Sequence, residues 1–251
     1  MGSEFVRHFL SNEWQVIGLD NNEWATASFP THPNLTKKLR GFESITGSYD
    51  LIVHCAAYKH IDLIESNKEA AGYNNVELTK VLYSNVTGPV LFISTDKAVE
   101  PSSFYGQTKK EGEEITKVRG GVIARLGNIM GSSGSVIPKW EAAIAAGDPL
   151  PITDRRMTRY MTQGSEAVIK IMELYPLASP GDVIIPSLGE PISLLDLAEQ
   201  TLQLHGLTLV GKNPYPIVDI GIRPAEKLHE KLSWDDEKVI ISNLSGNIVR
   251  R

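Results

Sequence analysis

The hydrophobic and polar positions form alternating blocks over the first half of the chain. Short apolar runs at 14–20, 50–57, 89–95 and 120–127 predict buried strands. Apolar residues spaced three and four apart predict helices over 3–12, 60–85 and 105–118, and the helical segment 60–85 is expected to break near Asn67 or Gly72. Strands that alternate with helices, and that are apolar along nearly their whole length, predict a parallel sheet covered on both faces.

The pattern changes after residue 128. We expect a loop over 131–135, helices over 137–147, 165–175 and 194–206, and extended segments over 149–162 and 182–187. The stretch 215–234 predicts a strand that runs into a helix led by Pro224, whereas residues 21–48 remain unassigned because Pro30 and Pro33 interrupt any helix. The sequence therefore predicts an α/β protein with a Rossmann-like, doubly wound parallel sheet over residues 1–128. A smaller α/β lobe is expected over 129–251, with some of its segments returning to the first domain.

The composition is that of an ordinary globular protein. The 251 residues are 41% hydrophobic, which suffices for a sizeable core, and a net charge of −5 provides no basic surface for nucleic acid. Cys55 is the only cysteine, so an internal disulfide and a cysteine zinc site are excluded, and we expect no metal. No apolar stretch reaches membrane-spanning length and no apolar leader opens the sequence, so we expect a cytoplasmic protein with no membrane contact.

The segment STDKAVEPSSFYGQTKK, residues 94–110, carries the candidate chemistry. Lys109 follows Tyr105 by four positions, so the two share one face of the predicted helix. A cation beside a phenol lowers the pKa of the phenol, and a tyrosine tuned in this way can exchange a proton with a sugar or alcohol hydroxyl. The competing interpretation is a solvated helix face with ordinary surface charges. Because Thr95 and Asp96 lie at the carboxyl end of the preceding strand, where open α/β sheets bind ligands, we favour a proton-handling centre.

Five more blocks occur in order along the chain. They read HCAAYKHIDLIE (54–65), NNVELT (74–79), ARLGNIMGSSGSVIP (124–138), LPITDRRMTRY (150–160) and GIRPAEKLHEKL (221–232). Together with STDKA and its tyrosine and lysine, they resemble the extended short-chain dehydrogenase/reductase superfamily. The resemblance is closest to the nucleotide-sugar 4,6-dehydratases of capsule, O-antigen and flagellin-glycan pathways, and it covers nearly the whole chain.

The sequence departs from the family pattern in three places. Members often carry Met where this chain has Tyr105, and Ala225 replaces a usual Gly in the GIRP block, which we take as a mild change. The region 21–48 is shorter than expected and lacks a clear adenine-contacting motif.

The resemblance implies NAD as the cofactor. It assigns Gly2, as the last glycine of a phosphate-binding turn, to the cofactor, together with Ala56, Ala57, Tyr105 and Lys109. Asp20 would hold the adenosine ribose, and because a carboxylate there repels a 2′-phosphate, NADP is less expected. The alternative role for Asp20 is to cap a turn before Asn21 and Asn22.

The first strand and the earlier glycines of such a cofactor site have no counterpart ahead of Gly2. We expect the natural parent to carry roughly ten more residues, a strand and a glycine turn. We also expect this chain to bind NAD poorly without them.

The resemblance places the sugar nucleotide between the two parts of the chain. Arg159 and Arg223, with Arg156 nearby, would bind a diphosphate, since a guanidinium matches its geometry. Asn128 would add a hydrogen bond and Glu226 would take ribose hydroxyls. Lys59 and Asn75 complete the implied substrate contacts, and Asn75 matches the family's active-site asparagine.

The implied activity is that of a UDP-N-acetylhexosamine 4,6-dehydratase acting on UDP-N-acetylglucosamine, in a homo-oligomer. Tyr105, assisted by Lys109, would take the O4 proton, and Thr95 would hold the O4 region. Lys97 would remove the C5 proton and Asp96 would protonate the leaving C6 hydroxyl. A C4 epimerase and a non-catalytic nucleotide-sugar binding paralogue remain as alternatives, the first opposed by the acid–base pair and the second supported by the missing glycine turn.

Overall fold

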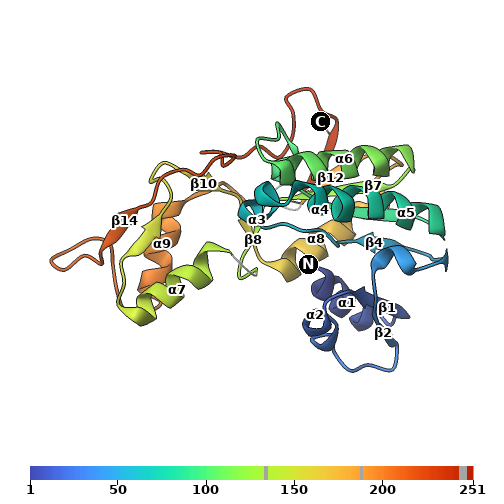
Figure 1. Ribbon diagram of the computed structural model, residues 1–251, viewed down its shortest axis with the longest axis horizontal. Coiled ribbons are helices and arrows are strands. Elements are labelled where there is room, and N and C mark those ends of the chain that lie inside the picture. The colour runs from blue at the N-terminus through green and yellow to red at the C-terminus, as the bar shows by residue number, and fades with distance from the viewer. Residues whose placement is uncertain (133–134, 187–188, 243–247, 251) are drawn as a thin grey trace.

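The computed structural model describes residues 1–132, 135–186, 189–242 and 248–250. Its centre is a six-stranded sheet, and Figure 1 shows helices on both sides of it. The strand order is β16 (Ile248–Arg250), β15 (Val239–Ser242), β12 (Val183–Ile185), β7 (Val122–Leu126), β6 (Val90–Thr95) and β4 (Ile52–His54). All neighbours pair in parallel except β15 and β16. The predicted Rossmann-like α/β fold is confirmed, and β12, β15 and β16 return to the sheet from the second half of the chain.

The two faces of the sheet bury different apolar residues of the same strands. Leu91 and Ile93 of β6 belong to a core cluster with Phe5 and Phe9 of α1 (Gly2–Ser11), and with Ile171 of α8 (Gly164–Leu174). Phe92, between them, turns to the opposite face, which is covered by α6 (Phe104–Val118) and α5 (Leu78–Asn85). Side chains alternate along a strand, so a run that is apolar at every position must be covered on both sides.

A small unit lies at the β4 side of this sheet. It pairs β1 (Val16–Asp20) in parallel with β2 (Leu35–Leu39), and α2 (Glu23–Ala27) connects them. This pair forms a sheet of its own, and within the described part of the chain no strand joins β1 to β4. Phe29 packs there against Val6 and Leu10 of α1. A Cβ on Gly18 would approach the Phe29 ring to 2.9 Å, so this close packing requires glycine.

The predicted long helical segment is divided into several pieces. Helix α3 (Ile61–Ser66) ends at Asn67, α4 (Lys68–Gly72) follows, and a π-helical turn, η2 (Tyr73–Glu77), leads into α5. The break expected near Asn67 or Gly72 is confirmed, because both positions mark a boundary. The short elements η1 (Phe42–Ser44), β3 (Gly47–Ser48) and β5 (Val86–Thr87) close this side of the fold, and β3 pairs with β5.

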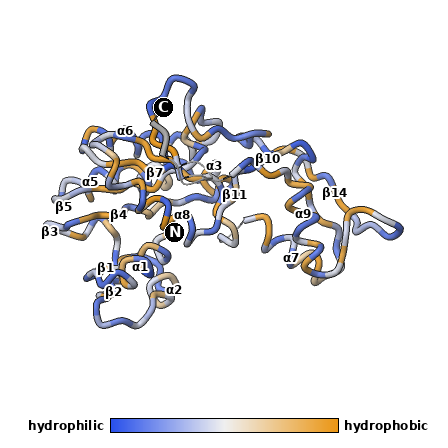
Figure 2. The backbone as a smooth tube through the Cα atoms, turned by 180° about the vertical axis from the view of Figure 1, so that it is seen from behind, coloured by the Kyte–Doolittle hydropathy of each residue, from blue (hydrophilic) through white to orange (hydrophobic). Residues whose placement is uncertain are grey.

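The second lobe has its own core. Helices α7 (Val136–Ala146) and α9 (Leu194–Gln203) pack over β9 (Leu150–Ile152), which pairs with β14 (Ile217–Asp219). Trp140 is completely buried in this core and donates a hydrogen bond to the Pro151 carbonyl oxygen. Figure 2 shows hydrophobic segments in both the central sheet and this lobe.

Short pairings link the lobe to the rest of the chain. They are β10 (Thr158–Arg159) with β13 (Ile192–Ser193), and β11 (Met161–Thr162) with β8 (Asn128–Ile129). The remaining 3-10 turn is η4 (Tyr175–Leu177). Among the described residues no helix is both long and apolar enough to cross a membrane.

The helix expected after Pro224 is not formed, so that prediction is wrong. Ala225 adopts a left-handed φ of 68°, which a helix cannot contain and which favours glycine. Backbone carbonyls of this segment accept hydrogen bonds from distant side chains instead, at Ala225 from Ser102 and at Lys227 from Arg159. Tertiary contacts therefore replace the helical hydrogen bonds. Ala225, which stands where the family pattern has Gly, is consequently a strained residue.

Candidate active site

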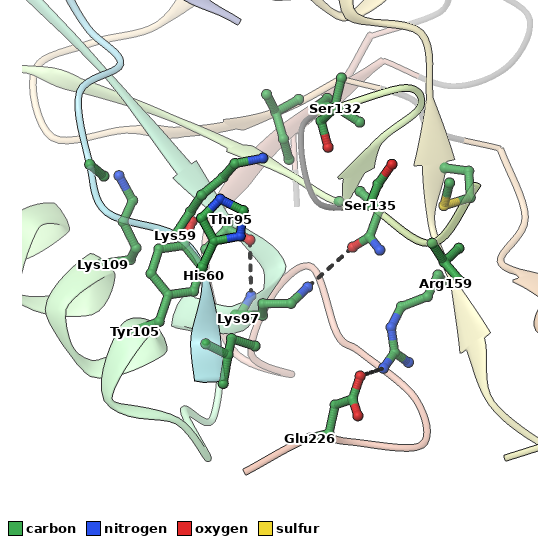
Figure 3. A pocket seen from close by; sticks show the side chains of 18 of the residues that line it. Lys59, His60, Thr95, Lys97, Tyr105, Lys109, Ser132, Ser135, Arg159 and Glu226 are labelled. Carbon is green, nitrogen blue, oxygen red and sulfur yellow. Dashed lines mark hydrogen bonds and ion pairs between the residues drawn. The ribbon is translucent and has the colours of Figure 1, made fainter. Parts of the chain in front are cut away.

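A cavity of about 570 Å³ opens at the carboxyl ends of β6 and β7, facing the second lobe. Figure 3 shows Lys97 near its middle, with Tyr105 on one side and the Arg159–Glu226 pair on the other. Eleven of the predicted site residues line it: Gly2, Ala57, Lys59, Thr95, Lys97, Tyr105, Lys109, Asn128, Arg159, Arg223 and Glu226. The structure thus brings together residues spread over more than 220 positions of sequence.

The acid–base pair lies on a 3-10 turn, η3 (Asp96–Ala98), directly after β6. Asp96 is fully buried beneath the cavity, and its Oδ1 accepts hydrogen bonds from Thr95 Oγ1 at 2.8 Å and from Lys97 Nζ at 3.0 Å. Its Oδ2 has no hydrogen-bond partner among the described residues. Lys97 Nζ also donates to Asn128 Oδ1 at 3.1 Å, so the lysine spans the two strand ends.

Lys97 is held in its charged form. Burial alone would lower the pKa of the ammonium, but the carboxylates of Asp96 and Glu230 outweigh that effect and the pKa is raised. A base must be neutral to accept a proton. Lys97 can therefore serve as the proposed base only after it has given up a proton.

Tyr105 lies in the first turn of α6, whose start is fixed by two features. Ser103 Oγ accepts a hydrogen bond from the Gly106 amide at 3.0 Å and caps the helix. A Cβ on Gly106 would overlap the Lys97 carbonyl oxygen, so glycine is what allows the helix to reach η3. Tyr105 and the acid–base pair consequently reach the same cavity.

The expected lowering of the Tyr105 pKa is wrong. Burial of the phenol and the negative charge of Asp96 raise its pKa, and a hydrogen bond with Thr95 only partly opposes them. Lys109 does not lower the pKa of Tyr105 as expected. Its Nζ instead donates to the Ile93 carbonyl oxygen at 2.6 Å and lies 3.9 Å from the centre of the Phe92 ring. Burial lowers the pKa of Lys109 to about 8, against the opposing effects of Glu113 and Cys55.

The residues at one end of the cavity fit part of a dinucleotide. Gly2 opens α1, whose first turn has no side-chain cap, and it lines the same cavity as Ala57, Tyr105 and Lys109. Asp20 does not line the cavity, and its carboxylate accepts a hydrogen bond from the Asn22 amide at 2.9 Å. The structure thus shows the turn-capping hydrogen bond of the alternative role, and a ribose contact of the same carboxylate stays a prediction. Ala56 packs instead beside the cluster around Phe42 and Leu82.

Asn75 does not line this cavity, and its expected substrate contact stays a prediction. It lies in the π-helical turn, buried, with Oδ1 accepting from the Tyr58 amide and Nδ2 donating to the Tyr58 carbonyl oxygen and to Thr108. These bonds fix the loop that carries Lys59 into the cavity. Burial lowers the pKa of Lys59.

The three arginines differ in their environments. Arg159 is almost fully buried, and three of its hydrogen bonds go to the carbonyl oxygens of Thr158, Lys227 and Leu228. Arg223 is more exposed and pairs with Asp62 at 2.7 Å at the cavity wall. Arg156 pairs with Asp154 and does not line the cavity, which removes it from the expected diphosphate set. Arg159 thus holds the chain in place, while Arg223 lies open to a ligand.

Several cavity residues, and one residue next to the cavity, were missed by sequence reasoning. Lys139 projects from α7 into the cavity, and Ser132 and Ser135 line the same wall. Ser135 Oγ is buried without a hydrogen-bond partner in the described part of the chain, as is Glu226 Oε2 across the cavity. Glu230 lies 3.5 Å from Lys97. Glu230 belongs to a recognised block, but the position of Lys139 depends on how α7 is oriented.

Comparison with known proteins agrees with this geometry. Residues 34–249 match the model of the family described as "Polysaccharide biosynthesis protein". The probable polysaccharide biosynthesis protein EpsC of Bacillus subtilis is 37% identical over 192 residues, which are 72% of this chain and 32% of that protein. The inverting UDP-N-acetylglucosamine 4,6-dehydratase of Campylobacter jejuni is 29% identical over 75% of this chain and 57% of its own length.

Other matches carry a different activity in their names or show the fold. A UDP-glucose 4-epimerase of Rickettsia typhi is 29% identical over 83% of this chain and 64% of that enzyme. The structure of DesIV, a dTDP-glucose 4,6-dehydratase of Streptomyces venezuelae with NAD and TYD bound, has a TM-score of 0.78 at 20% identity and covers 92% of this chain and 84% of that one. This chain spans only about a third of the length of the first curated relatives it matches.

The fold is Rossmann-type, and the chain is similar to proteins named as nucleotide-sugar dehydratases and epimerases. The chain belongs to the polysaccharide biosynthesis protein family.

Proposed function

We propose that this protein is an NAD-dependent UDP-N-acetylhexosamine 4,6-dehydratase that acts on UDP-N-acetylglucosamine. The observation that carries the proposal is the position of the Asp96–Lys97 pair at the cavity, next to Tyr105. A 4,6-dehydration needs an acid and a base for elimination in addition to a group that handles the O4 proton. The named relatives include such a dehydratase.

Each residue then has one chemical task. Bound NAD would supply hydride acceptance and return. Tyr105 accepts the O4 proton once its phenol has lost its own proton, and Thr95, which contacts both Tyr105 and Asp96, orients the O4 region. Once C4 is a ketone the C5 hydrogen is acidic, and the neutral amine of Lys97 removes it. Asp96, which has taken the proton that Lys97 gave up across their 3.0 Å contact, then protonates the leaving C6 hydroxyl.

We propose that residues 1–128 hold the cofactor and that 129–251 mainly hold the sugar nucleotide, with β12, β15 and β16 completing the sheet. Gly2, Ala57 and Lys109 line the cofactor end, while Arg223 and Lys139 supply positive charge for a diphosphate. Glu226, with its buried unpaired Oε2, is placed to accept ribose hydroxyl groups. We retain NAD over NADP because Asp20 closes β1, where a carboxylate disfavours a 2′-phosphate.

C4 epimerisation is the second candidate, because relatives of similar identity are named as epimerases. An epimerase needs the same tyrosine and cofactor but has no task for Asp96 and Lys97. The deciding experiment is to incubate the protein with UDP-N-acetylglucosamine and NAD and to follow products by NMR. A 4-keto-6-deoxy sugar supports the dehydratase, a hexosamine epimer supports the epimerase, and calorimetric binding without turnover would favour a non-catalytic binding protein.

A further inference from the structure

Glu230 is a buried carboxylate that the mechanism above does not use. Its side chain is 3% exposed, and its Oε1 lies 3.5 Å from Lys97 Nζ. Its Oε2 lies 3.5 Å from Lys227 Nζ and makes no hydrogen bond within the described residues. Lys97 therefore lies between two carboxylates, Asp96 from its own turn and Glu230 from a segment more than 130 residues away.

The segment that carries Glu230 is fixed at several points. Lys227 Nζ donates to the Val99 carbonyl oxygen at 2.7 Å, directly after the turn that bears Lys97. Arg159 donates to the Lys227 and Leu228 carbonyl oxygens, and the Thr158 amide donates to Leu228 as well. These contacts come from both parts of the chain. The approach of Glu230 to Lys97 is thus fixed by the contacts of the segment that carries Glu230.

The charged groups that act on Lys97 come from several elements packed around it. Asp96 and Glu230 attract its ammonium, and Arg159 repels it. Lys227 faces Glu230 from the far side, and the Tyr105 phenol faces Asp96. Two close carboxylates against one more distant guanidinium leave a net preference for a positive charge on Lys97.

We propose that Glu230 is a positioning residue, which holds Lys97 between two carboxylates and sets the pH at which Lys97 becomes available as a base. This inference rests on the dehydratase function proposed above. Asp96 has its own task as the acid, so its charge changes during the reaction. Glu230 takes no part in the proposed proton transfers, and its carboxylate keeps Lys97 directed at the cavity between them.

The test uses Glu230→Gln, which keeps the shape and removes the charge. In the full chain labelled with ¹³C at lysine Cε, the Lys97 signal is identified by its loss in Lys97→Met and is titrated with pH. In Glu230→Gln we expect the Lys97 midpoint to fall by about 1–3 pH units, the usual effect of one nearby opposite charge. The rising limb of the pH–rate profile should move to lower pH by a similar amount.

Two further variants keep the test decisive. Glu100→Gln removes an exposed carboxylate that pairs with Lys231 in the same region, and it should leave the Lys97 midpoint unchanged. Lys227→Met removes the cation facing Glu230, and it should move the midpoint upward. An unchanged Lys97 midpoint in Glu230→Gln, or in Lys227→Met should Glu230→Gln not fold, overturns the inference. The titration needs no substrate, so its failure is distinct from failure of the proposed function, which the product analysis decides.

Discussion

Gly106 lies against Lys97 so closely that any Cβ on Gly106 would overlap the Lys97 carbonyl oxygen. This contact sets the distance between the helix that carries Tyr105 and the turn that carries the acid–base pair. The proposed reaction needs a proton acceptor at O4 and an acid–base pair at C5 and C6 of the same sugar ring. The glycine thus determines whether one substrate can reach both groups.

Gly106→Ala should therefore displace the start of α6. We expect the free energy of unfolding to fall by about 1–3 kcal/mol, the usual cost of overpacking. We also expect the kcat of the folded protein to fall, because Tyr105 is displaced from the acid–base pair. Denaturant unfolding and initial rates would measure the two effects. Gly72→Ala is the matched control, because a Cβ there meets only the Phe104 ring at 3.7 Å and should be tolerated. Normal kcat in Gly106→Ala would show that the spacing is not critical.

Lys97→Ala should abolish dehydration and leave sugar-nucleotide binding nearly intact. Its proposed work is proton transfer, and removal of a general base typically costs about 10²-fold or more in rate. Product formation by NMR and binding by calorimetry separate the two effects. Lys117→Ala, which removes a surface partner of Glu114, serves as control and should turn over normally. Near-normal turnover in Lys97→Ala would show that Lys97 is not the base.

The fold was largely predictable because its central strands are continuous apolar runs. Leu91, Phe92 and Ile93 all needed cover, and the sheet provides it on both faces. Strand β2 was not predicted because its sequence, LTKKL, places two lysines in a short edge strand without an apolar pattern. Strand β15 is also short, and its partner β12 is more than 50 residues away. Pairings of this kind leave little trace in the local sequence.

The site was predictable only where a block of sequence carried it. Lys97 and Tyr105 lie within one short segment, so the location of one strand end was enough to bring them together. The roles of Asn75 and Arg159 were not predictable, because a side chain that binds backbone carbonyls looks the same in sequence as one that binds a ligand. The raised pKa of Tyr105 depends on burial and on Asp96, which only the packed structure reveals.

Arg223→Ala should weaken sugar-nucleotide binding by about 1–3 kcal/mol, the scale of a hydrogen bond to a charged group. Binding of NAD should barely change, because Arg223, which pairs with Asp62, is assigned to the sugar nucleotide in the proposed function. Calorimetry with each ligand gives both affinities. Arg155→Ala removes a comparably exposed ion pair, with Asp219, outside the cavity and should affect neither ligand. Equal losses for both ligands in Arg223→Ala would assign Arg223 a structural role.

Lys109 makes the stability of the protein depend on pH in a defined direction. Its pKa in the folded protein is about 8, below the ordinary value of 10.5, mainly because it is buried. Between these two pH values the unfolded chain binds more protons at this residue than the folded chain does, so the contribution of Lys109 to stability increases as pH rises through that window. Each unit of pKa difference corresponds to about 1.4 kcal/mol.

The contribution of Lys109 to stability can be isolated by denaturant unfolding of the wild type and of Lys109→Met, from below pH 8 to above pH 10.5. We expect the wild type to gain stability relative to Lys109→Met as pH rises, by a few kcal/mol at most. Lys110→Met is the control, since Lys110 is the next residue on the same helix and is exposed over the Trp234 ring. That variant should show no such relative trend. If the stabilities of wild type and Lys109→Met run parallel across this range, Lys109 keeps its ordinary pKa of 10.5, and the buried amine that contacts the Ile93 carbonyl oxygen stays charged up to that pH.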